Sequence, residues 1–133
     1  MTRESSAQQA VAPYGCELIL DLHHCNTRRF TRSGIRGFCT RLCKLIDMER
    51  CDLHFWDDVG VPHSEQQTNP KTKGTSAVQF ILTSTIVIHT LDLMNAAYVN
   101  IFSCKDFDAE EAAKFAAEWF GSSDWTANMV IRR

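Results

Sequence analysis

The residues whose types suggest chemistry in this sequence are a serine, a histidine and a cysteine. Ser84 lies in a run of three hydroxyl residues between two strand-like segments, His89 follows in the second of these segments, and Cys104 ends the next one. Hydroxyl and thiol groups act as nucleophiles or acids, and imidazole transfers protons. A hydroxyl run at a strand junction can be structural, or it can be the place where a protein cuts its own chain.

The spacing of these residues constrains how they can meet. Ser84 and His89 are an odd number of residues apart, so in one regular strand their side chains would point to opposite faces. A bend or bulge at the junction would bring them together, and we expect Ser84, His89 and Cys104 to share one neighbourhood. Each also has a structural interpretation, as a strand hydroxyl, a half-buried imidazole or a small core residue.

Length and composition indicate a globular chain. A chain of 133 residues has the usual length of a single domain. Its contents of 44% apolar and 23% charged residues are ordinary for globular proteins. The net charge of −2 does not indicate the basic surface that nucleic-acid-binding proteins have. Basic residues cluster between Arg28 and Lys44, where we interpret them as the solvated face of a helix.

The N-terminus and the cysteines bear on location and metal binding. Residues 1–14 are polar, lack the apolar core of a signal peptide and are expected to form a disordered tail. No apolar run approaches the ~20 residues that a membrane-spanning helix needs, so we expect a cytoplasmic protein with no membrane partner.

The six cysteines form no CxxC pair, and the spacing of His23, Cys25, Cys51 and His54 matches no common zinc module. No metal is therefore expected.

The hydrophobic patterns predict an α+β fold, a two-layer sandwich of an antiparallel sheet with two helices on one face. The second helix has a capping box formed by Asp108 and Glu111, and Gly121 ends it. The expected strands are 16–22, 51–56, 74–82, 85–90, 97–103 and a last one near 125–133, and the expected helices are 33–46 and 108–120. A long polar segment, 57–73, is expected to be a functional or disordered loop.

Three segments of this sequence resemble one family. They are "ELILDLHHCN", "GTSAVQFILTSTIVIHT" and "AAYVNIFSC". They are similar to the opening strand, the self-cleavage segment and the cysteine-bearing strand of the small prokaryotic S-adenosylmethionine decarboxylases. The spacings between serine, histidine and cysteine agree with that family without a gap.

The resemblance implies a pyruvoyl enzyme of polyamine biosynthesis, specifically of spermidine. Ser84 would attack the carbonyl of Thr83, and β-elimination would leave chains 1–83 and 84–133, the second with a pyruvoyl group. Ser76 would assist this processing, His89 would remove the α-proton, and Cys104 would reprotonate the substrate carbon. The pyruvoyl carbonyl would form a Schiff base with the amine of a small amino-acid substrate. Family enzymes are dimers with active sites near the subunit interface, so a homodimer is expected.

The sequence also departs from the family pattern. Thr83 stands where the family has glutamate, and Leu93 stands where a glutamate holds the substrate ribose. Asp92 would replace that glutamate if the strand end shifts by one residue. Phe55 or Trp56 is the expected counterpart of the aromatic side chain that stacks on adenine. The segment 57–73 resembles an insertion.

Three hypotheses therefore stay open. The first is a self-cleaving decarboxylase of S-adenosylmethionine. The second keeps the chemistry but changes the substrate to another amino acid, such as arginine or ornithine, because Leu91 and Leu93 are apolar. The third is an uncleaved homologue that acts as a binding or regulatory subunit, because Thr83 replaces the usual glutamate.

Overall fold

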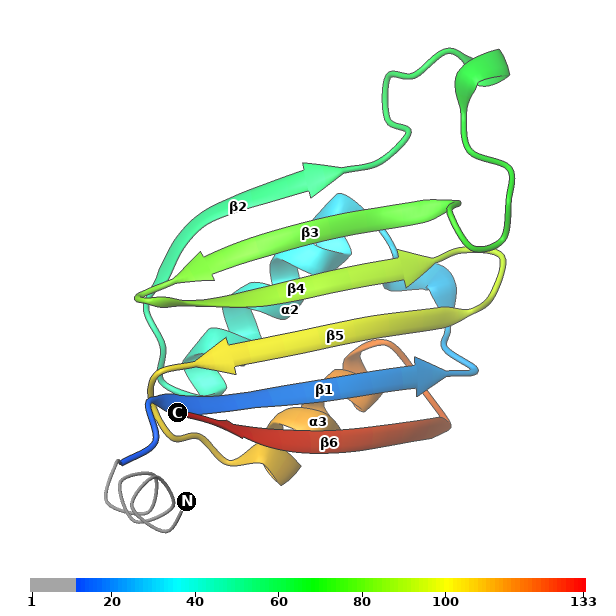
Figure 1. Ribbon diagram of the computed structural model, residues 1–133. Helices are drawn as coiled ribbons and strands as arrows, with labels where there is room; N and C mark the ends of the chain where they lie inside the picture. Colours follow the sequence, from blue (N-terminus) through cyan, green and yellow to red (C-terminus); the bar gives the residue numbers. More distant parts are fainter. Residues whose placement is uncertain (1–11) are drawn as a thin grey trace, which may run out of the picture.

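The computed structural model describes residues 12–133, which form one antiparallel sheet with two helices (Figure 1). Most of the expected tail lies outside the described residues. The strands and helices are β1 (Gly15–His23), α2 (Arg32–Leu45), β2 (Arg50–Trp56), β3 (Gly74–Ile81), β4 (Ser84–Leu91), β5 (Ala96–Ser103), α3 (Ala109–Trp119) and β6 (Asp124–Arg132). Two short 3₁₀ turns are η1 (Thr27–Arg29) and η2 (His63–Glu65).

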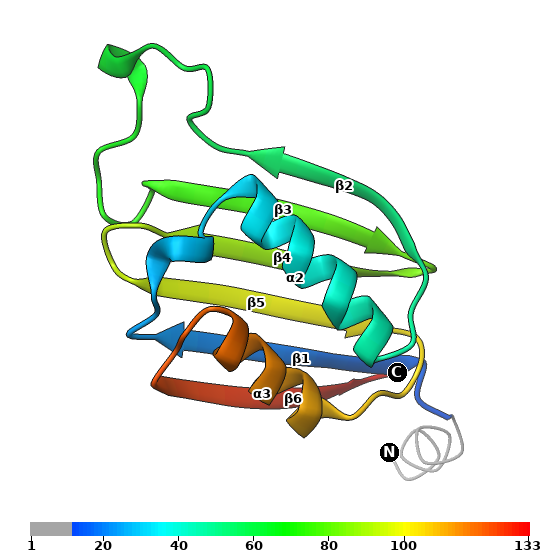
Figure 2. The ribbon, with the colours of Figure 1, turned by 180° about the vertical axis from the view of Figure 1, so that it is seen from behind.

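The six strands lie in the order β2-β3-β4-β5-β1-β6, and each neighbouring pair is antiparallel. Both helices lie on one face of the sheet, as the view from behind shows (Figure 2). The expected α+β two-layer architecture is confirmed. No helix within residues 12–133 is long and apolar enough to cross a membrane.

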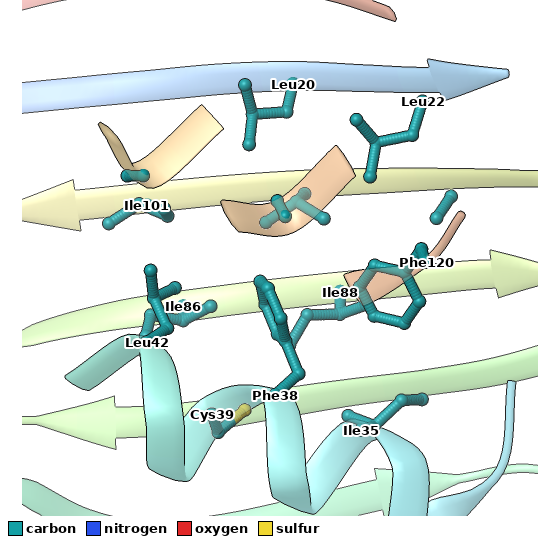
Figure 3. Packing of buried hydrophobic residues seen from close by; sticks show 14 of the residues in the cluster. Leu20, Leu22, Ile35, Phe38, Cys39, Leu42, Ile86, Ile88, Ile101 and Phe120 are labelled. Carbon is teal, nitrogen blue, oxygen red and sulfur yellow. The ribbon is translucent and has the colours of Figure 1, made fainter. Parts of the chain in front are cut away.

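The core lies between the helices and the sheet because both contribute one apolar face. In α2 the buried side chains recur at helical spacing, from Ile35 through Phe38 to Leu42. Phe38 contacts Phe120, the residue that follows α3, with ring centroids 5.0 Å apart. These rings pack over the buried residues of the central strands, which include Ile88 (Figure 3).

The capping residues set where the helices begin. The Thr31 hydroxyl accepts a hydrogen bond from the backbone N–H of Gly34, and the Asp108 carboxylate accepts one from that of Glu111. Gly121 follows α3 with a positive φ of 63°, a conformation that glycine adopts without strain.

The opposite face of the sheet carries no helix (Figures 1 and 2). Along β4 the residues alternate between buried positions on the helix face, such as Ile86 and Ile88, and more exposed positions on this second face, such as Val87 and His89. We call this second face the open face.

The junction between β3 and β4 is a tight hairpin. Ile81 pairs with Ser84, which leaves Leu82 and Thr83 as the exposed turn. The pairing then runs without a register shift to the pair of Gly74 and Leu91. The bend or bulge that we expected to reorient Ser84 toward His89 is therefore not found, because every residue of β4 pairs in sequence with β3.

The segment 57–73 is held to the domain by ion pairs. The guanidinium of Arg32 makes two hydrogen bonds of 2.7 Å to the carboxylate of Asp57. Lys73 Nζ lies 3.0 Å from Asp58 Oδ2, and the backbone N–H of Asp92 donates to the carbonyl of Lys73. The loop thus has a defined path at the end of the sheet where β4 finishes.

Candidate functional site

One part of the candidate site lies at the hairpin end of β4. The backbone N–H of Cys104 donates a hydrogen bond of 3.0 Å to Ser84 Oγ, and Ser84 is 8% exposed. Cys104 directly follows β5, the strand that pairs with β4, so the sheet register brings the two residues together. The Ser103 hydroxyl, bonded to the backbone of Lys105, fixes the turn that carries Cys104.

The surroundings of Cys104 favour its thiolate. A hydrogen bond from the backbone N–H of Thr83 and a second from the Ser84 side chain lower the pKa of the Cys104 thiol below its ordinary value. Burial, by contrast, raises the pKa of Cys39 to about 12 and that of Cys43 to about 11. Cys104 is thus the thiol whose environment favours reactivity.

A second part of the site lies near the other end of β4, on the open face. Ser76 and His89 are directly opposite each other in the β3–β4 ladder, and Ser76 Oγ lies 2.8 Å from His89 Nδ1. Both line a cavity of about 440 Å³, together with Trp56, Leu91 and Tyr98 and with loop residues Lys71 and Thr72. This hydrogen bond fixes the orientation of the imidazole ring.

The structure does not bring these two parts together within one chain. Five residues of regular strand separate Ser84 from His89, which corresponds to about 17 Å along β4. Ser84 faces the helix side with Ile86 and Ile88, whereas His89 faces the open side. Our expectation of one shared neighbourhood is therefore wrong for a single chain: Cys104 joins Ser84, and His89 joins Ser76.

The pair at His89 belongs to a row of residues that crosses the sheet. Successive register partners join β2 to β6, and the row contains Trp56, Ser76, His89, Tyr98, Asp21 and Thr126. Of the two aromatic candidates, Trp56 is 64% exposed and lies in the cavity beside Ser76. Phe55 points to the helix side and packs against the core, with the guanidinium of Arg36 5.3 Å from its ring centroid.

Comparisons with known proteins identify the family and the fold. A family model described as "S-adenosylmethionine decarboxylase" matches residues 16–133. The chain belongs to the S-adenosylmethionine decarboxylase family. Its fold is similar to the crystal structure of the adenosylmethionine decarboxylase from Aquifex aeolicus VF5, with a TM-score of 0.72, 18% identity and 92% of each chain covered. No curated protein matches the sequence.

The expected ribose-binding position is occupied by an exposed leucine. Leu93 lies in the turn after β4 and is 58% exposed, and Leu91 lines the cavity with His89. Asp92, the expected substitute, lines a neighbouring cavity of about 490 Å³ with Asp58, Lys73 and the start of α2. Its Oδ1 atom is buried and has no hydrogen-bond partner among residues 12–133, and burial raises the pKa of its carboxyl. The cavity that Asp92 lines adjoins the cavity of Ser76 and His89, because Gly74 and Thr75 belong to both.

Sequence reasoning missed three residues on the open face. Tyr98 and Asp21 line a cavity beside His89, and Lys71 lines the cavity on its other side. The alternation of β1 and β5 placed Asp21 and Tyr98 on the side opposite the core, which was the available signal. Their alignment with His89 depends on the strand order, which the sequence did not supply. Among the described residues, 12–133, no group of three His, Cys, Asp or Glu residues could hold a metal ion.

Proposed function

We propose that this protein is a self-processing, pyruvoyl-dependent decarboxylase of S-adenosylmethionine that serves polyamine biosynthesis. The observation that carries the proposal is the pairing of Ser84 with Cys104, directly after the exposed turn formed by Leu82 and Thr83. The family match over residues 16–133 supports it.

In this proposal each side chain has one task. Ser84 Oγ attacks the carbonyl carbon of Thr83, so the acyl group moves from nitrogen to oxygen. His89, oriented by Ser76, removes the α-proton of Ser84, and elimination releases residues 1–83 with a terminal carboxylate and leaves dehydroalanine at residue 84. Water hydrolyses the imine form of this dehydroalanine, which releases ammonia and forms the pyruvoyl group. The pyruvoyl group left on residue 84 supplies a carbonyl that withdraws electrons from the substrate. Cys104 holds the proton that returns to the substrate carbon.

The geometry favours an active site built from two copies of the chain. His89 must reach the α-carbon of Ser84, yet about 17 Å of strand separates them in one chain. The open face, without helices, carries apolar side chains such as Val87 and Ile19 that a second sheet would cover. In such a two-fold dimer with antiparallel sheets, the hairpin end of β4 in one copy would lie over Ser76 and His89 of the other. Ser84 lies at that end but faces the helix side, so it would have to reach His89 of the other copy around the end of the sheet.

A second candidate keeps the chemistry and changes the substrate. Leu91 lines the cavity at His89, and Leu93 cannot hold a ribose. An amino acid without a nucleoside, such as ornithine or arginine, has no ribose and would not need a residue that binds one. Release of carbon dioxide from a panel of amino acids and S-adenosylmethionine separates the two candidates.

The intact mass of the freshly purified, denatured protein tests the proposal. We expect two fragments, residues 1–83 and residues 84–133, the second with the mass of a pyruvoyl end. The matched control, Ser84→Ala, should give one chain, because it lacks the attacking oxygen. A single unbroken wild-type chain would favour the third hypothesis, an uncleaved binding or regulatory subunit.

A further inference from the structure

Asp21 lies on the open face, in the same transverse row as His89. Tyr98 is the register partner of both residues, so the backbones of Asp21 and His89 are two strand spacings, or about 10 Å, apart. Together they line a cavity of about 360 Å³. This cavity adjoins the one that Ser76 lines, because His89 and Tyr98 belong to both.

The surroundings of Asp21 combine apolar and polar groups. The other lining residues of this cavity are Ile19, Leu20, Val87, His89, Tyr98, Val99 and Asn100. Asp21 is half-buried, and within residues 12–133 its carboxylate has no ion pair and no hydrogen-bonding side chain. Glu17, which is on the same face of β1, is by contrast held by Arg132 and Asn100. A cationic ligand in this cavity would therefore be able to form an ion pair with the Asp21 carboxylate.

The charges beside His89 have opposite signs. Asp21 lies on one side of the His89–Tyr98 pair, and Lys71 lines the cavity on the other side. A positively charged group in this groove would therefore be attracted toward Asp21 and repelled from the loop that carries Lys71.

We infer that Asp21 determines specificity by selecting substrates whose side chain carries a positive charge. This inference rests on the proposed function and adds a requirement to it. The sulfonium of S-adenosylmethionine and the ammonium of ornithine both supply such a charge, so either substrate candidate fits. If two open faces meet, Asp21 is enclosed, and its charge acts more strongly in the less polar surroundings.

Calorimetric titration of the full-length Ser84→Ala protein tests the inference without turnover. The probes form two matched pairs: S-adenosylmethionine against S-adenosylhomocysteine, and L-ornithine against L-norvaline. We expect the charged member of one pair to bind at least tenfold more tightly than its neutral counterpart, and the pair that shows this identifies the source of the charge. Asp21→Asn should abolish the difference, because it preserves shape and removes the charge.

Two further variants keep the test decisive. Glu110→Gln, on the exposed surface of α3, changes the net charge equally and should leave the preference intact. Asp21→Glu retains the charge and should keep a preference for the cation even if Asp21→Asn does not fold. Equal binding of both members of each pair to the Ser84→Ala protein, or a preference that survives in Asp21→Asn, would overturn the inference. Because binding needs no cleavage, an uncleaved wild type would end the proposed function without affecting this result.

Discussion

At the scale of residues, the most informative contact is the hydrogen bond from the Cys104 backbone to the Ser84 hydroxyl. It places a thiol and a hydroxyl beside an exposed turn, with the N–H of Thr83 directed at the sulfur. Thr83 contributes mainly through its backbone N–H, which any residue except proline would supply at that position, and its hydroxyl adds a weaker hydrogen bond to the same thiol. The loss of the family's glutamate leaves this contribution in place.

The lowered pKa of the Cys104 thiol predicts selective alkylation. A thiol with a lowered pKa forms its thiolate at lower pH, and the thiolate is the form that reacts. In the uncleaved Ser84→Ala protein, iodoacetamide should modify Cys104 well before Cys39 and Cys43, whose pKa values are raised to about 12 and 11. Peptide mass spectrometry across pH 6–9 measures the order. Faster labelling of Cys39 in the folded protein would contradict it.

At the scale of elements, the sequence pattern predicted every strand and both helices. Most of them have one apolar face, whereas β6 is almost wholly exposed. The cap at Asp108 was also predicted correctly. The error concerned the junction at Ser84: odd spacing and regular pairing keep Ser84 and His89 on opposite faces. The row that contains Asp21 was not predictable, because β1 reaches β5 through pairing that is distant in sequence. The alternation of apolar and polar residues predicts which face of a strand is buried, but it does not predict which strands lie beside it.

The capping contact at α3 gives a stability prediction. Asp108 accepts a hydrogen bond from the N–H of Glu111, and removing such a cap costs about 1 kcal/mol. Asp108→Ala should therefore lower the free energy of unfolding by about 1 kcal/mol in urea denaturation. Asp108→Ser retains an accepting oxygen, so its free energy of unfolding should fall much less. Equal losses in both variants would mean that the side chain stabilises α3 in another way.

At the scale of the whole molecule, the two parts of the candidate site lie at opposite ends of β4 and on opposite faces. One copy has all four side chains, but they form two distant pairs: Ser84 with Cys104, and Ser76 with His89. Two copies related by a two-fold axis through the open face would bring the hairpin end of β4 in each copy close to Ser76 and His89 of the other. Each site, closed around the end of the sheet, would then take residues from both chains.

Co-expression of two inactive variants tests this arrangement. His89→Ala and Ser84→Ala should each remain uncleaved when expressed alone. Expressed together, the His89→Ala chain should be cut, because the Ser84→Ala copy supplies His89. The matched control replaces the helper with the double variant Ser84→Ala/His89→Ala, which should give no cut. Intact masses report each chain separately, and an uncut His89→Ala chain beside the Ser84→Ala helper would rule out a shared site.

The strand order has a consequence for what a cut would do to the molecule. Residues 1–83 supply β1, β2 and β3, and residues 84–133 supply β4, β5 and β6. In the sheet these strands interleave, because β1 lies between β5 and β6, and β3 lies beside β4. The two pieces could not separate on dilution without breaking three ladders of hydrogen bonds. A severed chain would thus behave as one folded unit, and the break would free a new chain end without loosening the scaffold that holds it.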